Sequence, residues 1–165
     1  TVYGLSLGPT PLIGRTLLAA DPLGAPPGDA YIGDVGANQY ILGVDTPQAK
    51  AFEDGFFKSS GGKWPSFVAM EAYIGTKMYF EAVKKAKTFE TEAVIKAFEG
   101  MTYEGPLGAI TMRKEDHQAQ SPVAVGEVVK KTKYYDFPYL KPIMIVPAAE
   151  VSATLEESGW KPYKE

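Results

Sequence analysis

Residues 45–128 read "DTPQAKAFEDGFFKSSGGKWPSFVAMEAYIGTKMYFEAVKKAKTFETEAVIKAFEGMTYEGPLGAITMRKEDHQAQSPVAVGEV", and the spacing of their apolar residues decides the fold. Three stretches in which apolar residues recur every three or four positions come first, as in helices that bury one face. Shorter stretches with β-branched residues between turn residues follow, as in strands. The order predicts a run of helices that gives way to strands.

The first helix is predicted from Thr46 to the glycine pair at 61–62. Thr46 is a good N-cap residue, and Pro47 suits the first helical position, where a missing N–H costs nothing. Phe52 and Phe56 are four residues apart and therefore share one face. The two glycines favour a helix end there.

The second helix is predicted over about 65–87, and its apolar residues are numerous enough that we expect it to be heavily buried. Its stripe consists of Phe67, Met70, Ile74 and Met78, which Tyr73, Phe80 and Val83 widen. A third, shorter helix follows, capped by Thr88 or Thr91 and ended by Gly100. We expect Val94 and Phe98 to face inward.

Strands and turns are predicted for the rest of the chain. Extended segments are expected at 1–7, 29–35, 38–44, around 107–112, 121–135 and 137–147. Residues 8–30 hold many prolines and glycines and are expected to form a long ordered loop. Residues 148–158 are expected to form a short last helix that Gly159 ends.

Composition excludes several classes of function. The 165 residues carry a net charge of −3 and no cysteine, which excludes thiol nucleophiles and cysteine-bound zinc and argues against a nucleic-acid partner. No apolar run approaches the length of a membrane span. The single histidine, His117, follows Glu115 and Asp116 in a predicted turn, where neighbouring side chains point apart. We therefore expect no catalytic residue, no metal site and no cofactor, and an exposed or turn-capping role for His117.

The order and spacing of these elements resemble the later part of the periplasmic solute-binding proteins of the branched-chain amino-acid type, the Leu/Ile/Val-binding or type I periplasmic binding proteins. The resemblance rests on the "P…K.F" helix start, the "AY" helix that ends near "KA", the "E…AV..A" helix, the "GP.G" turn and the acidic "DHQ" turn. It is strongest over 45–128 and looser over 1–134.

This resemblance implies an α/β fold of two lobes, each with three α/β/α layers, joined by a hinge. Residues 1–33 and 125–165 would be pieces of the C-terminal lobe, and residues 40–120 a piece of the N-terminal lobe. Hinge crossings would lie at 32–40 and 118–126. Because the family's first segments have no counterpart in these residues, we expect a companion N-terminal segment of the same protein.

The resemblance also implies a function, which is that of the solute-binding component of an ABC-type importer rather than an enzyme. Its partners would be a small-molecule ligand and the membrane permease, and its location periplasmic or otherwise extracytoplasmic with a lipid anchor. A ligand-sensing receptor domain of the same fold is an alternative. A small α/β enzyme that uses His117, Asp116 or Glu71 is a further alternative, although no pairing of residues favours it.

Two segments are candidates for ligand contact. In amino-acid-binding relatives, an acidic residue after a strand of the C-terminal lobe meets the ligand's ammonium group, but the matching segment here is neutral. The candidate residues are Ser6, Leu7, Gly8 and Thr10 in that segment, and Phe67, Val68 and Glu71 at the start of the second helix, beside Trp64. The neutral loop and the helix N-terminus favour a ligand with a carboxylate or amide and an apolar or aromatic body. Glu71 is the counter-argument, because it could receive an ammonium group.

Overall fold

The computed structural model describes residues 13–14, 29–132 and 135–161. The predicted strand at 1–7 and most of the predicted loop at 8–30 lie outside these residues. In chain order the helices and strands are β1 (Ile13–Gly14), the 3-10 turn η1 (Asp29–Tyr31), β2 (Val35–Asn38), α1 (Pro47–Ser59), α2 (Phe67–Ala86), α3 (Thr91–Phe98), β3 (Thr102–Gly105), β4 (Gly108–Met112), β5 (Ala119–Gln120), β6 (Val123–Val129), β7 (Tyr139–Val146), α4 (Ala148–Val151) and α5 (Leu155–Ser158).

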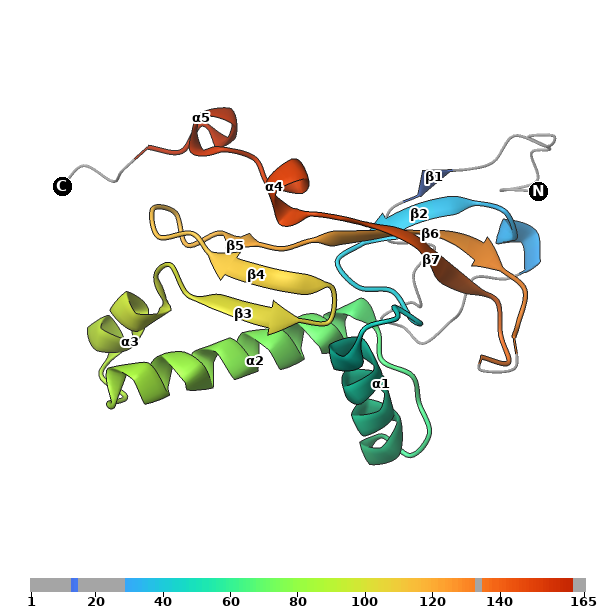
Figure 1. The fold of residues 1–165 in the computed structure, drawn as a ribbon, viewed down its shortest axis with the longest axis horizontal. Coiled ribbons are helices and arrows are strands. Elements are labelled where there is room, and N and C mark those ends of the chain that lie inside the picture. The colour runs from blue at the N-terminus through green and yellow to red at the C-terminus, as the bar shows by residue number, and fades with distance from the viewer. Residues whose placement is uncertain (1–12, 15–28, 133–134, 162–165) are drawn as a thin grey trace.

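The described strands form two sheets. One has the order β1-β2-β6-β7, in which β1 and β2 are parallel and the other neighbours antiparallel. The other has the order β3-β4-β5 and lies beside α2 (Figure 1). The chain leaves the first sheet after Asn38 and returns to it between Gln120 and Val123. These passages fall within the expected hinge crossings, whose assignment to a hinge remains a prediction.

Helix α1 forms as its sequence predicts. The Thr46 side chain accepts a hydrogen bond from the N–H of Ala49, and Pro47 occupies the first turn. The Thr46 hydroxyl also donates to the carbonyl of Pro106 at 2.7 Å, so the cap attaches the helix to the β3–β4 turn. Phe52 is buried, and the glycine pair beyond the helix has positive φ angles of 72° and 90°.

Helix α2 is less buried than its apolar content predicts. Met70, Ile74 and Met78 are buried as expected, with 2–5% of their surface exposed. The expected widening of the stripe is wrong, because Tyr73 is 40% and Phe80 51% exposed and Val83 is only partly buried. The helix begins at Phe67, one residue after its cap, Ser66. It is therefore covered along one stripe rather than around most of its circumference.

Three further predictions are corrected at element boundaries. Residues 29–35 do not form a strand, because Gly33 has a φ of 94° that extended backbone does not adopt, and β2 begins only at Val35. Helix α3 is capped by Glu90, whose carboxylate accepts from two backbone N–H groups, rather than by a threonine. Residues 148–158 form two single turns, because Ser152 between them has extended backbone (ψ 122°).

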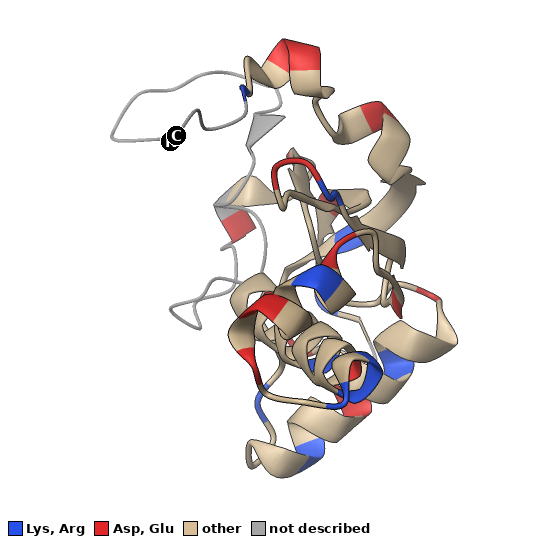
Figure 2. Ribbon diagram, turned by 90° about the vertical axis from the view of Figure 1, so that its left-hand side faces the viewer, with Lys and Arg blue, Asp and Glu red and all other residues tan. Residues whose placement is uncertain are grey.

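The core joins the sheet to the helices. One buried cluster combines residues that adjoin the four-stranded sheet with residues of α1, α2 and β4. The first group consists of Tyr40 and Leu42 after β2, Tyr135 between β6 and β7, and Tyr139 in β7. The second group consists of Phe52, Met70, Ile74, Met78 and Ile110. Acidic and basic residues are interspersed on the helices (Figure 2). No helix among the described residues is long and apolar enough to cross a membrane.

Candidate functional site

A hollow of about 650 Å³ lies where α2, the β4–β5 hairpin and the residues after β7 meet. One wall is apolar and comes from α2, α3 and β4. The residues of this wall are Met70, Ile74, Gly75, Met78, Phe98, Ile110 and Met112. A space of this size and character suits a small organic molecule with an apolar body.

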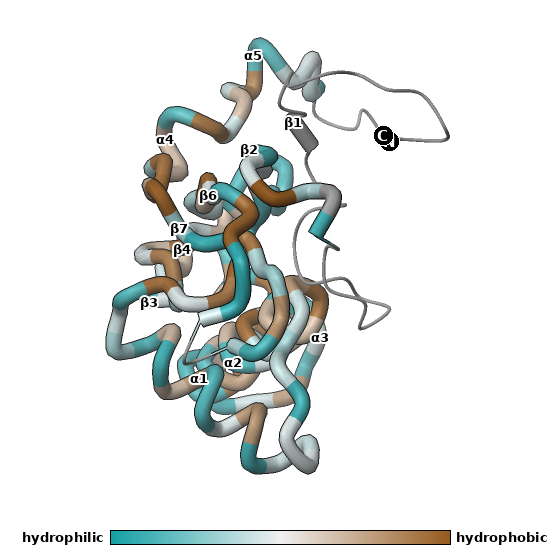
Figure 3. The backbone as a smooth tube through the Cα atoms, turned by 90° about the vertical axis from the view of Figure 1, so that its right-hand side faces the viewer, coloured by the Kyte–Doolittle hydropathy of each residue, from teal (hydrophilic) through white to brown (hydrophobic). Residues whose placement is uncertain are grey.

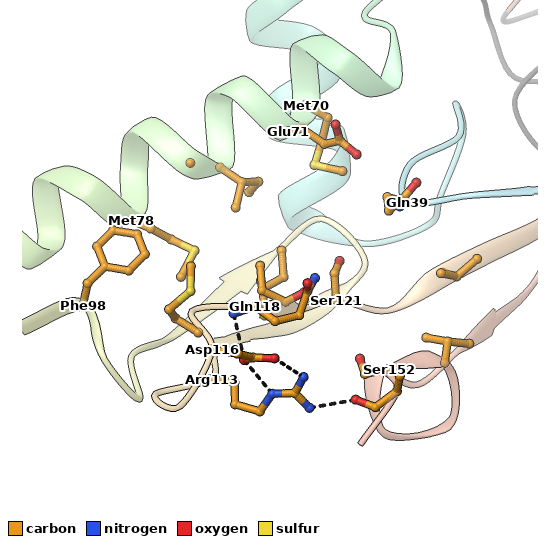
Figure 4. A pocket seen from close by; sticks show the side chains of 18 of the residues that line it. Gln39, Met70, Glu71, Met78, Phe98, Arg113, Asp116, Gln118, Ser121 and Ser152 are labelled. Atoms are coloured by element: carbon orange, nitrogen blue, oxygen red, sulfur yellow. Dashed lines mark hydrogen bonds and ion pairs between the residues drawn. The ribbon is translucent and has the colours of Figure 1, made fainter. Parts of the chain in front are cut away.

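Polar side chains line the hollow next to this apolar wall. Glu71 projects from the first turns of α2, and Gln39 follows β2 (Figure 4). Gln118, at the end of the β4–β5 turn, and Ser121, between β5 and β6, also line the hollow. Within the described residues, no hydrogen bond or ion pair engages the side chains of Glu71 or Gln39, so both remain available to a ligand.

A tight ion pair closes one end of the hollow. Arg113 donates from Nε to Asp116 Oδ1 at 2.8 Å and from Nη2 to Oδ2 at 2.5 Å. Both side chains are largely buried, with 12% and 10% of their surface exposed. The hydrogen bond from Arg113 is the main reason why the pKa of Asp116 falls to about 2. The guanidinium is therefore engaged within the protein and is not a free anion receptor.

The residues predicted to contact the ligand have different surroundings. Ser6, Leu7, Gly8 and Thr10 lie outside the described residues. Glu71 lines the hollow, whereas Phe67 packs against the core cluster and Val68 is 46% exposed without lining this hollow. Trp64 packs against Phe57 and Tyr135, with ring centroids 4.5 and 4.8 Å away. Ligand contact by these residues stays a prediction.

His117 occupies a turn. Its φ of 55° places it in the left-handed region, and its Nε2 lies 3.2 Å from Glu99 Oε1 with the side chain 55% exposed. This confirms the expectation of an exposed turn residue. Among the described residues, no group of three histidine, cysteine, aspartate or glutamate side chains is placed to hold a metal ion.

Several contributors to the site were not predicted from the sequence. Gln39, Arg113, Asp116, Gln118 and Ser121 come from turns and segment ends, where no periodicity reveals which way a side chain points. The only available signal was that Gln39 falls within the predicted crossing at 32–40, and Gln118 and Ser121 within the one at 118–126.

Comparison with known proteins places these features in a family. A family profile described as "Periplasmic binding protein" matches residues 3–133, which is more than half of the chain. The Leu/Ile/Val-binding protein homolog 4 of Brucella abortus (strain 2308) is 36% identical over 81 residues, which are 47% of this chain and 20% of that protein.

Solved structures show the same fold. A solute-binding protein of an ABC transporter from Rhodopseudomonas palustris BisB5, in complex with 3,4-dihydroxybenzoic acid, superposes with a TM-score of 0.71 at 26% identity. The match covers 84% of this chain and 37% of that one. The leucine-, isoleucine-, valine-, threonine- and alanine-binding protein of Brucella ovis, in its closed conformation, superposes with a TM-score of 0.71 at 24% identity, over 86% and 38% of the two chains. The chain thus spans under two fifths of these relatives.

Proposed function

Because the chain belongs to the periplasmic binding protein family, with the type I α/β fold of its solved relatives, we propose that it serves as the solute-binding component of an ABC-type importer. Its role is to bind a small carboxylate, aromatic or amino-acid-like solute, not to catalyse a reaction. The observation that carries the proposal is the hollow in which an apolar wall is bordered by the unengaged side chains of Glu71, on the same helix, and Gln39.

The apolar and the polar residues of the hollow favour different parts of a solute. The methionine- and isoleucine-lined wall suits an aliphatic or aromatic body. The free carboxylate of Glu71 suits an ammonium group, because a charge buried in a closed site without a partner carries a penalty of several kcal/mol. Gln39 can donate to a carboxylate or accept from an amine. Glu71 therefore supports an amino-acid-like solute more directly than the neutral segment at 4–10 does.

The importer role implies a location and partners. A solute-binding component of this kind works outside the cytoplasm, either in the periplasm or held to the membrane by a lipid anchor, and delivers its solute to the permease. A companion segment of the same protein would complete the second side of the cleft. The partial coverage of the solved relatives supports this part of the proposal.

A thermal-shift panel tests the proposal. Leucine, isoleucine, valine, benzoate and 3,4-dihydroxybenzoate are each added to the protein, since a solute that binds only the folded state stabilises it by about 2.7 kcal/mol at one hundred times its Kd. We expect at least one of these solutes to raise the melting temperature. Failure of the whole panel would contradict the proposed solute classes.

A pair of variants assigns the role of Glu71. Glu71→Gln keeps the size of the side chain but removes its charge, so stabilisation by the amino acids should disappear while stabilisation by the aromatic acids persists. Glu81→Gln is the matched control, because Glu81 lies on the same helix, pairs with the exposed Lys84 and does not line the hollow. Equal responses of both variants to the amino acids would show that Glu71 does not bind an ammonium group.

A further inference from the structure

The segment that follows β7, residues 147–158, forms one side of the hollow. We call this segment the strap. It contributes Val151, Ser152, Ala153 and Ser158 to the lining, and Figure 4 shows Ser152 across the drawn space from Glu71. Neither α4 nor α5 contains a buried residue, and Val151 is 41% exposed. Apolar burial therefore contributes little to holding the strap in place.

The strap has its own internal order. Thr154 and Glu157 form a reciprocal capping box, with the N–H of Thr154 donating to Glu157 Oε2 at 2.8 Å and the N–H of Glu157 donating to Thr154 Oγ1 at 3.1 Å. Gly159 ends the turn with a φ of 67°. Because these bonds lie within the strap, they keep its shape but do not attach it to the hairpin.

Arg113 supplies the attachment. Its Nη1 donates to the carbonyl oxygen of Ala153 at 2.7 Å, across a separation of 40 residues in sequence. The other side of the guanidinium is occupied by both oxygens of Asp116, and Asp116 Oδ1 also accepts from the N–H of Gln118 at 3.1 Å. The planar fork is thus fixed in orientation, so that Nη1 points at the strap.

We propose that Arg113 is a positioning residue for solute binding, which with Asp116 holds the strap against the β4–β5 hairpin as a wall of the hollow and thereby slows release of the solute. The effect on solute release rests on the proposed function. The attachment of the strap by Arg113 rests on the contacts alone. Lysine cannot replace arginine here, because a single ammonium group cannot bind both carboxylate oxygens side by side and also reach the carbonyl.

A thiol-reactivity measurement tests the attachment without any solute. The chain has no cysteine, so Ser152→Cys introduces its sole thiol at a partly buried position on the strap. In the Arg113→Ala background we expect a disulfide reagent such as DTNB to modify this thiol about tenfold faster or more, and Arg113→Lys to behave almost like alanine. Lys84→Ala, which breaks an exposed ion pair on α2, is the matched control and should leave the rate unchanged. An unchanged rate in Arg113→Ala overturns the attachment.

Binding kinetics test the effect on solute release. With leucine or 3,4-dihydroxybenzoate as the probe, whichever stabilises the unmodified protein, the dissociation rate from Arg113→Ala should rise about tenfold while the association rate stays within about twofold. A strap that loosens without faster release overturns the positioning role. If Arg113→Ala does not fold, Asp116→Asn serves instead, because it keeps the shape of the side chain and breaks the paired contact. If neither probe binds the unmodified protein, the proposed function and the release role fail together, while the thiol rates still decide the attachment.

Discussion

Glu53 on α1 is a buried carboxylate whose removal should be severely destabilising. The residue is 6% exposed. Its Oε1 accepts from the hydroxyl of Tyr40 at 2.7 Å and from the N–H of Gly43 at 2.9 Å, and its Oε2 accepts from the hydroxyl of Tyr135 at 2.9 Å. Tyr40 lies on the segment that leaves β2, and Tyr135 follows β6. One side chain therefore fastens α1 to both of these segments.

The expected magnitude follows from what Glu53→Ala leaves behind. Two tyrosine hydroxyls and one backbone N–H lose their acceptor, and Tyr40 and Tyr135 are only 1% and 6% exposed. Each buried group left unsatisfied costs about 1–3 kcal/mol, and relaxation or an entering water molecule offsets part of the sum. We therefore expect a loss of about 3–5 kcal/mol, a large share of the 5–15 kcal/mol that typically stabilises a domain. Tyr40→Phe, which removes one donor and leaves two, should cost about 1–2 kcal/mol.

Urea unfolding followed by tryptophan fluorescence measures this loss, because Trp64 packs against Tyr135 and reports on that region. Asp54→Ala is the control, since Asp54 is the exposed neighbour on the same helix and its replacement should stay within about 0.5 kcal/mol. The free energies of unfolding are obtained by fitting both proteins to a two-state transition. A Glu53→Ala protein whose free energy of unfolding lies within 1 kcal/mol of that of the unmodified protein would refute the reasoning.

Alkaline pH offers a second test of the same cluster. Burial, followed by the charge of Glu53, raises the pKa of both Tyr40 and Tyr135 above the ordinary value of 10.0. The unfolded chain therefore releases these protons more readily than the folded one, so the stabilisation is complete below pH 10 and declines as the pH rises above it. Spectroscopic titration should show both phenols ionising only as the protein unfolds.

Three further predictions concern other parts of the chain. Because Arg113 lowers the pKa of Asp116 from 3.8 to about 2, the stability that this pair contributes should be lost between about pH 4 and 2, and Asp116→Asn should remove that part of an acid-unfolding profile. Gly126→Ala should strongly destabilise the protein in thermal unfolding, because the added methyl group would lie 2.6 Å from the carbonyl oxygen of Lys141 in β7. Gly75→Ala should instead stabilise it by about 0.5–1 kcal/mol, because Gly75 lies within helix α2 and the added methyl group would meet no atom within 4 Å. His117→Ala should change the unfolding free energy by no more than about 0.5 kcal/mol, since its contact is exposed.

The sequence predicted the helices well because their signals are local. Thr46, Pro47 and the glycines after α1 act within a few residues of the helix ends, and the spacing of Met70 and Ile74 fixes the buried stripe of α2. The extent of burial was mispredicted because Phe80, although apolar and in contact with the ring of Tyr79, is left half exposed. Local pattern cannot reveal which of two apolar faces a neighbouring layer covers.

The candidate site was harder to predict because its parts meet only through tertiary contacts. Glu71 was named from its place near the start of a helix and does line the hollow, while its contact with a ligand stays a prediction. The contact between Arg113 and Ala153 spans 40 residues and involves a backbone carbonyl, which every residue possesses. Likewise, nothing in the sequence distinguishes Glu53 from the exposed acid beside it, since only the approach of two distant tyrosines makes it a buried acceptor.

These two contacts differ in a way that bears on motion around the hollow. Glu53 holds its partners by three buried hydrogen bonds, whose simultaneous loss is costly. The strap is held to Arg113 by one exposed hydrogen bond, whose donor and acceptor water can satisfy when the bond breaks. Local opening occurs where the free energy needed is smallest. A solute entering or leaving the hollow should therefore displace the strap, while the connections fastened by Glu53 keep α1 fixed to the four-stranded sheet.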